Sequence, residues 1–216
     1  MFNDSYGLTK AVLEGRKTMT RRVIKAPRTM EGKDVYGYSV VKYPRTGVPI
    51  EVMALDADGA QINNILPKYK VGEVVAVAQN YKDVREGGYP VDSRYDAFRE
   101  ADWGIGVNGA LKGSAGETNK MFVKADLMPH HVRITSVRVE RLQDISDEDA
   151  LREGIYKKTL CPPGDIDYFY HSEPRSKWDV YPSAREAFAG LIDNVSGKGT
   201  WASNPWVFVY EFELVK

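Results

Sequence analysis

The sequence predicts an α+β protein built as a mixed β-barrel with flanking helices and a long irregular insertion. Three observations lead there: a terminal segment of alternating aromatic residues, residues 206–214; an apolar run at residues 71–78; and two helix-capping patterns, at 146–149 and 183–186. With 216 residues, 43% of them hydrophobic, the chain can form one domain with a sizeable core. We expect a single domain over residues 1–216, with insertions at about 30–66 and 82–127.

The chain opens with a short predicted helix followed by a strand. Asp4 or Ser5 can cap the helix, apolar residues within 8–12 share one of its faces, and Gly15 ends it. Residues 20–24 have the β-forming character of a strand.

The middle of the chain is predicted to form strands followed by an insertion. Segments 35–43 and 48–55 are rich in Val, Tyr and Ile and are separated by a turn, which predicts a hairpin or meander. Residues 71–78 are apolar at both alternating positions, so we expect a strand buried on both sides. Glycines and charges without periodicity fill residues 81–120, as in a long functional or mobile loop.

The last third alternates strands and helices. In the strand predicted at 132–142 the apolar alternation changes phase at residues 135–136, which predicts a β-bulge. The first capping pattern opens a helix that ends near Gly154. The second opens a helix with core-facing Phe188, Leu191 and Ile192.

The final strand predicts which of its faces is buried. Its aromatic row at 206–214 is expected in the barrel core. Glu211 and Glu213 mark the opposite face as the solvent side.

Composition restricts the function classes. Thirty basic and thirty acidic residues cancel, so only a local patch, such as the basic stretch at 16–28, could attract a polyanion. Cys161 is the only cysteine, which excludes an intrachain disulfide and fits a reducing compartment. No signal peptide or membrane-spanning run is recognisable, so we expect a cytoplasmic protein without a membrane partner. The spacing of histidine and cysteine predicts no metal site, and no motif predicts a cofactor.

Residues 15–22 carry the strongest functional signal. They read Gly-Arg-Lys-Thr-Met-Thr-Arg-Arg and fit the pattern G-x-K-x-x-T-x-R. Lys17, Thr20 and Arg22 bring an amine, a hydroxyl and a guanidinium together, and an amine beside a hydroxyl can generate a nucleophile. The competing interpretation is a solvated basic turn after a helix.

This octapeptide is the signature of the ASCH family of small β-barrels related to PUA domains. The chain resembles that family, and most closely its larger phage and prophage members, through further phrases in the same order. These are Met-Pro at 128–129, Arg-Val-Glu-Arg-Leu-Gln-Asp-Ile at 138–145 and Asn-Pro-Trp-Val at 204–207. The resemblance implies a PUA-like barrel with a cleft lined by the signature.

The resemblance also implies a chemistry. Family members are associated with RNA or modified nucleosides, and small bacterial members are described as amidohydrolases that deacetylate N4-acetylcytidine with a lysine, a threonine and a glutamate. Lys17, Thr20 and Glu153 stand at the matching positions, with Glu148 or Asp149 as alternatives to Glu153. The residues expected to contact the substrate are Gly15, Arg16, Arg21, Arg22 and Gln79, the last where phage-type relatives commonly have glutamate.

The reaction expected from these residues is acyl transfer to Thr20, with neutral Lys17 as its base. Glu153 would then protonate the leaving nitrogen or activate water. In every version the partner is a nucleoside, a nucleotide or RNA; the sequence indicates no protein partner.

Two alternatives stay open. One is a non-catalytic RNA or modified-base binder, with Trp103 or Tyr81 stacking on bases. Its phosphate contacts would be Arg16, Arg21, Arg22, Lys25 and Arg28. The other is a ribonuclease, which His130, His131 and His171 do not support, because they form no acid–base motif.

Overall fold

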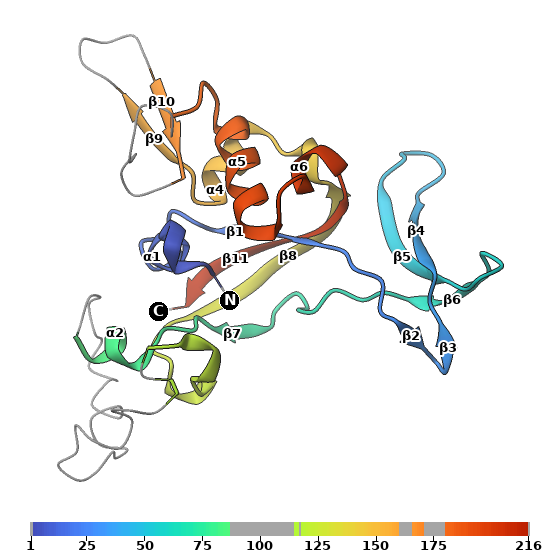
Figure 1. Ribbon diagram of the computed structural model, residues 1–216, viewed down its shortest axis with the longest axis horizontal. Helices are drawn as coiled ribbons and strands as arrows, with labels where there is room; N and C mark the ends of the chain where they lie inside the picture. The colour runs from blue at the N-terminus through green and yellow to red at the C-terminus, as the bar shows by residue number, and fades with distance from the viewer. Residues whose placement is uncertain (1, 87–114, 117, 160–165, 171–179, 216) are drawn as a thin grey trace.

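The computed structural model describes residues 2–86, 115–116, 118–159, 166–170 and 180–215 (Figure 1). Within them the chain is α+β, with more strands than helices. Trp103, Cys161 and His171 lie outside the described residues, so the expectations placed on them are not addressed by the structure. None of the described helices combines the length and the apolarity needed to cross a membrane.

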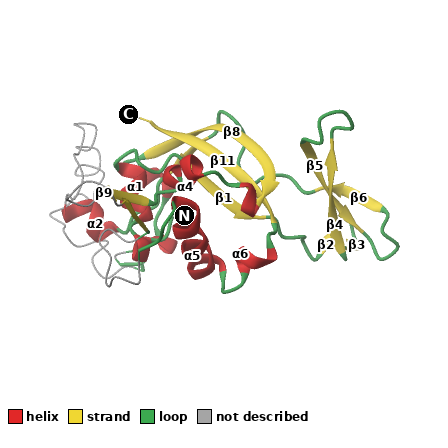
Figure 2. Cartoon of the chain, turned by 90° about the horizontal axis from the view of Figure 1, so that it is seen from above, coloured by secondary structure: helices red, strands yellow, loops and turns green. Residues whose placement is uncertain are grey.

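The centre of the molecule is a four-stranded antiparallel sheet curled into a half-barrel (Figure 2). Its strands, in spatial order, are β1 (Met19–Val23), β11 (Trp206–Val215), β8 (His131–Arg141) and β7 (Val74–Ala76). The prediction that the segments near 71–78, 132–142 and 206–214 share one sheet is confirmed. So is the bulge: Glu211 pairs with Ser136 and Phe212 with Ile134, so Thr135 is left without a partner across the ladder.

Three helices lie along one face of this sheet: α4 (Asp147–Arg152), α5 (Ala184–Ser196) and α6 (Thr200–Ser203) (Figure 1). The Ser183 hydroxyl accepts a hydrogen bond from the Glu186 N–H and so caps α5. The predicted core positions of α5 are confirmed, because Phe188, Leu191 and Ile192 are buried in one cluster with Val207 and Val209. The expectation that β11 turns this face to solvent is wrong for the first half of the strand, where Val207 and Val209 are buried against the helices; Glu211 and Glu213 lie in its second half.

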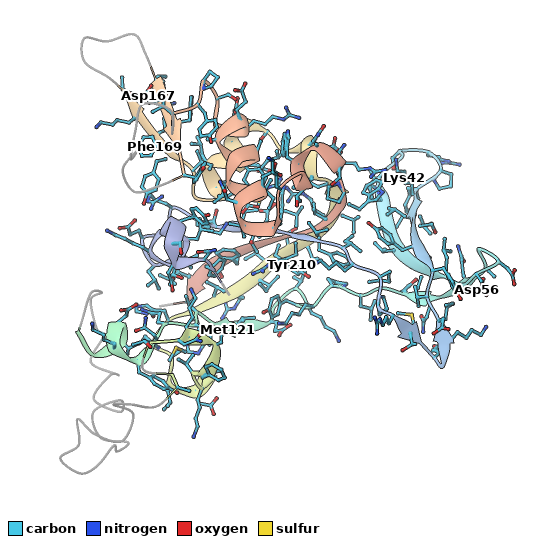
Figure 3. The ribbon with its side chains drawn as sticks, viewed as in Figure 1. Lys42, Asp56, Met121, Asp167, Phe169 and Tyr210 are labelled. Carbon is cyan, nitrogen blue, oxygen red and sulfur yellow. The ribbon has the colours of Figure 1, made fainter. Side chains whose placement is uncertain are left out.

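The concave face carries the aromatic row of β11. Phe208, Tyr210 and Phe212 pack there with Val132, Ile134 and Val12 of helix α1 (Leu8–Leu13). Tyr210 lies near the middle of the sheet in Figure 3. Each face of β11 is therefore buried in its own hydrophobic cluster.

The first helix differs from its prediction. Asn3, not Asp4 or Ser5, is the capping residue, and it accepts a hydrogen bond from the Ser5 N–H at the start of a 3-10 turn, Asp4–Tyr6. Gly7, with φ 65°, then separates this turn from α1.

The strand predicted at 71–78 is also different. Only Val74–Ala76 is extended, as an edge strand, and Val71 and Val74 are 64% and 48% exposed. Among the described residues its strand partner is β8, so it lies at the edge of the sheet, and its exposure shows that it is not buried on both sides.

The remaining strands form small sheets. The hairpin predicted between 35 and 55 is confirmed as β4 (Gly37–Lys42) and β5 (Pro49–Leu55). With β6 (Gln61–Asn64) they form a separate sheet (Figure 1), which contacts the half-barrel through β5 and β8. Two further ladders join β2 (Thr29–Met30) to β3 (Lys33–Asp34) and β9 (Tyr156–Thr159) to β10 (Ile166–Phe169).

Short helices complete the described chain. Helix α2 spans Tyr81–Glu86. Three 3-10 turns cover Lys120–Phe122, Ala125–Leu127 and Leu142–Asp144.

Candidate active site

The signature strand forms one wall of a cavity of about 520 Å³. That volume lies within the range of small-molecule binding sites, roughly 300–1,000 Å³. Other walls come from the N-terminal segment, from α5 and from residues 118–121. The predicted site residues that line it are Lys17, Thr20, Arg21, Arg22 and Glu153.

Backbone contacts explain why Lys17 and Glu153 meet. The N–H groups of Lys17 and Thr18 donate to the carbonyls of Ala11 and Arg152 at 2.9 Å each, so the signature turn is fastened to both α1 and α4. Glu153 is the C-cap residue of α4. The following residue is Gly154, with φ 103°, and a Cβ there would lie 3.6 Å from the Lys17 Cβ. A glycine permits this close approach and this backbone conformation.

Lys17 and Glu153 form a buried ion pair. The Lys17 Nζ lies 2.6 Å from the Glu153 Oε2 and 2.7 Å from the Glu153 carbonyl oxygen. Only 2% and 4% of the two side chains are exposed. Burial lowers the pKa of Lys17; Glu153 opposes this shift, and the nearby Arg22 and Arg21 reinforce it. The site therefore favours the neutral amine more than water does.

Arg21 holds the other oxygen of Glu153. Its guanidinium is fully buried and lies 3.2 Å from the Glu153 Oε1, 2.6 Å from Glu140 and 2.9 Å from Asp149. Both carboxylate oxygens of Glu153 thus accept hydrogen bonds, which fixes the orientation of the group toward Lys17.

The ion pairs continue away from the cavity. Arg138 bonds to Asp149 at 2.9 Å, to Glu140 at 3.0 Å and to Glu211. Arg152 lies 2.7 Å from Glu211, and its hydrogen bond is the main cause of a lowered pKa for that carboxyl. Every carboxylate in this network is matched by an arginine, which offsets part of the desolvation cost.

Thr20, the second residue of β1, lines the same cavity as Lys17. It is half-buried, and no hydrogen bond to its hydroxyl is found among the described residues. Thr20 also lines a second cavity of about 230 Å³, which adjoins the first. Its hydroxyl is thereby placed where a ligand could reach it from either side.

One wall of the cavity, which contains Phe2 and Lys120, was not predicted from the sequence. Lys120 donates to the Phe2 carbonyl, to Asp4 at 2.7 Å and to the Thr9 hydroxyl at 3.0 Å. The centroid of the Phe2 ring lies 5.8 Å from the Lys17 Nζ and 5.6 Å from the centroid of the Phe212 ring. An isolated lysine in an irregular segment carries no spacing signal, so this contact could not be foreseen.

Three predicted contact residues are placed elsewhere. Arg16 stacks on the Tyr156 ring at 4.0 Å and donates to its hydroxyl at 2.8 Å, outside the cavity lining. The Gln79 Oε1 lies 3.0 Å from the His130 Nδ1, away from the signature. Gly15 makes the turn after α1, with φ 74°, and does not line the cavity.

The structure also shows where the two alternatives to Glu153 lie. Asp149 lies in the arginine network, and Glu148 is exposed, so Glu153 is the member of this group that lines the cavity.

The basic stretch at 16–28 does not form one surface. Arg21 is enclosed by carboxylates, whereas Lys25 and Arg28 are exposed and outside the cavity lining. Tyr81 is only 3% exposed, and its hydroxyl accepts a hydrogen bond from the Lys124 N–H at 2.9 Å, so it cannot stack on a base as predicted. Within the described residues, no three histidine, cysteine or acidic side chains are grouped as a metal site would require.

Comparisons with models of known protein families, with curated proteins and with solved structures give no match for this chain. The ASCH resemblance thus stays a prediction from its motif.

Proposed function

We propose that this chain is an ASCH-type, PUA-like protein that hydrolyses the amide of an acylated nucleoside, of which N4-acetylcytidine is the simplest example. One observation carries the proposal: a buried lysine with a lowered pKa, oriented by a glutamate, lines the same cavity as a threonine whose hydroxyl makes no hydrogen bond to the described residues. A neutral amine next to a hydroxyl is the arrangement that nucleophilic acyl transfer requires.

The first step forms an acyl-enzyme. The Thr20 oxygen attacks the acyl carbonyl carbon while its proton passes to the Lys17 Nζ. Collapse of the tetrahedral intermediate breaks the carbon–nitrogen bond, and the protonated Lys17 returns the proton to the leaving N4 nitrogen. Arg22, which lines both cavities, supplies positive charge for the developing oxyanion.

The second step hydrolyses the threonine ester. Water adds to the ester carbonyl, Lys17 accepts its proton and returns it to the Thr20 oxygen, and the carboxylic acid leaves. Glu153 acts in both steps by holding the Lys17 amine, since its two oxygens are occupied by Lys17 and Arg21.

The volume and the charge distribution favour this function over RNA binding. A cavity of about 520 Å³ suits a nucleoside, and the basic residues of the signature are divided between a buried network and the cavity. An RNA groove would need those charges on one exposed face.

The direct test is incubation with N4-acetylcytidine and, separately, with a structured RNA, followed by chromatography. We expect cytidine and acetate in equal amounts and intact RNA. RNA fragments would indicate a nuclease. Tight RNA binding without release of acetate would indicate a binding module, and either result would overturn the proposal.

A further inference from the structure

The second cavity differs chemically from the first. Its volume is about 230 Å³, and most of the side chains around it are apolar or aromatic. It shares four residues with the larger cavity: Phe2, Thr20, Arg22 and Lys120. Apart from Lys68, its other walls are apolar or aromatic and include Tyr69, Val75, Ala78, Val123, Met128 and Tyr210.

The aromatic residues present mainly apolar ring surface to this cavity. Tyr69 and Tyr210 meet edge to face, with ring centroids 5.7 Å apart. The Tyr210 hydroxyl is already used, because it accepts a hydrogen bond from the Lys68 N–H at 2.9 Å. A ligand there would gain mainly from the removal of apolar surface from water.

The larger cavity carries more polar side chains, next to apolar ones from α5 and the N-terminal segment. Beside the Lys17–Glu153 pair it is lined by Asn3, Asp4, Ser5, Thr118 and Asn119. A nucleoside, which is large and rich in hydroxyl and amide groups, fits this cavity better than the small apolar one. Thr20 lies in the wall common to both, so a carbonyl next to it would have its two substituents in different cavities.

We propose that the small cavity receives the acyl group, and that the preferred substrate carries an apolar acyl chain larger than acetyl. This inference rests on the proposed function. An apolar cavity of roughly 150 Å³ can hold benzene, so a volume of about 230 Å³ accommodates a chain of about six carbons. An acetyl group would leave most of it unfilled.

The occupancy of the small cavity can be measured without turnover. N4-ethylcytidine and N4-hexylcytidine have no amide to cleave, and their affinities for the wild-type protein can be compared by isothermal titration calorimetry. We expect affinity to rise about fourfold for each added methylene, which is the fold-change for about 0.8 kcal/mol per buried methylene. Equal affinity for the two compounds would overturn the inference.

A substitution at the cavity wall localises the effect. Ala78→Leu places a larger side chain in the small cavity, and we expect it to abolish the preference for hexyl over ethyl, because the longer chain no longer fits. Ala57→Leu is the matched control, because Ala57 is exposed in a turn and outside both cavities. If Ala78→Leu fails to fold, Val123→Ala enlarges the same cavity and should extend the preference to longer chains.

Hydrolysis separates this inference from the proposed function. If N4-acetylcytidine and N4-hexanoylcytidine are cleaved with equal kcat/KM, the chain is a hydrolase and the acyl-cavity inference is wrong. If neither is cleaved but hexyl binds more tightly than ethyl, the cavity assignment holds and the catalytic proposal fails.

Discussion

The two sides of β1 have different surroundings, although the charged and polar residues on both sides belong to one short motif. Arg21 points to the helix-covered face, where its side chain is fully buried among three carboxylates. Thr20 and Arg22 line both cavities, whereas Arg21 lines the larger one beside α5. Arg22 is exposed and Thr20 half-buried.

This difference follows from the geometry of a strand, in which successive side chains point to opposite faces. Two adjacent arginines can thus have unrelated roles, one in stability and one in ligand contact. Lys17 precedes the strand and is not bound by this alternation, so it lines the larger cavity and also reaches Glu153. Four predictions test this division.

The largest effect is expected for Arg21→Ala. Loss of the guanidinium leaves Glu140, Asp149 and Glu153 without their shared cation, and breaking a buried ion pair from one side costs about 3–5 kcal/mol. Urea denaturation of Arg22→Ala is the matched control, with an expected loss below about 1 kcal/mol. Equal losses in the two variants would show that the faces are not energetically distinct.

Thr20→Ala tests the cavity side. Under the proposed function its turnover of N4-acetylcytidine should fall by about a hundredfold or more, because the covalent route is lost. Its unfolding free energy should stay within about 1 kcal/mol of wild type, since the hydroxyl makes no hydrogen bond with the described residues. Thr29→Ala, an exposed position on β2, should change neither property. Wild-type turnover in Thr20→Ala would remove the nucleophile from the mechanism.

The lowered pKa of Lys17 predicts a pH dependence that distinguishes it from an exposed lysine. Between this lowered pKa and the ordinary value of 10.5, the unfolded chain retains a proton that the folded protein has released. In that window the unfolding free energy contributed by this residue therefore rises with pH, by at most about 1.4 kcal/mol per pH unit. Below the lowered pKa the contribution is constant.

The measurement is the difference in unfolding free energy between wild type and Lys17→Met across pH. We expect this difference to increase through the window, and turnover to rise over the lower part of it. Lys158→Met, at an exposed position of β9, is the control. A difference that stays flat would mean that burial does not govern the protonation of Lys17.

The sequence was informative where one local pattern decided the outcome. The shift of apolar phase at Thr135 predicted the bulge, and the spacing of Phe188, Leu191 and Ile192 predicted the buried face of α5. Apolar content alone misled at Val74, because it cannot tell an edge strand from a central one. The same limit applies to side chains whose partners are distant: the contact of Arg16 with Tyr156 depends on a tertiary approach that no local pattern encodes.

The residues of the candidate site were likewise predictable where a local pattern linked them, and not where their partners are distant in sequence. The motif brought Lys17, Thr20 and Arg22 together because they are close in sequence, whereas Glu153 was reached only through the family resemblance. Gln79 lies beside His130, a contact not predicted because a position after a strand does not fix the direction of the side chain. Whether the residues in the cavity act as proposed remains a prediction for the assays above.

The smallest effect is expected for an ion pair on the same two strands, beyond the bulge. Arg133 on β8 faces Glu213 on β11, with 3.6 Å between nitrogen and oxygen and with 50% and 59% of the side chains exposed. Exposed pairs contribute about 0–1 kcal/mol because water and salt screen the charges and the long side chains lose entropy.

A double-mutant cycle of Arg133→Ala and Glu213→Ala should therefore give a coupling below about 0.5 kcal/mol that declines further in about 1 M salt, where the Debye length is about 3 Å. The same cycle on Arg21 and Glu140, where the arginine is fully buried, should give a larger coupling that salt changes little. If the exposed pair coupled as strongly as the buried one, strand pairing rather than burial would set the strength of these interactions, and the contrast between the two faces of β1 would lose its physical basis.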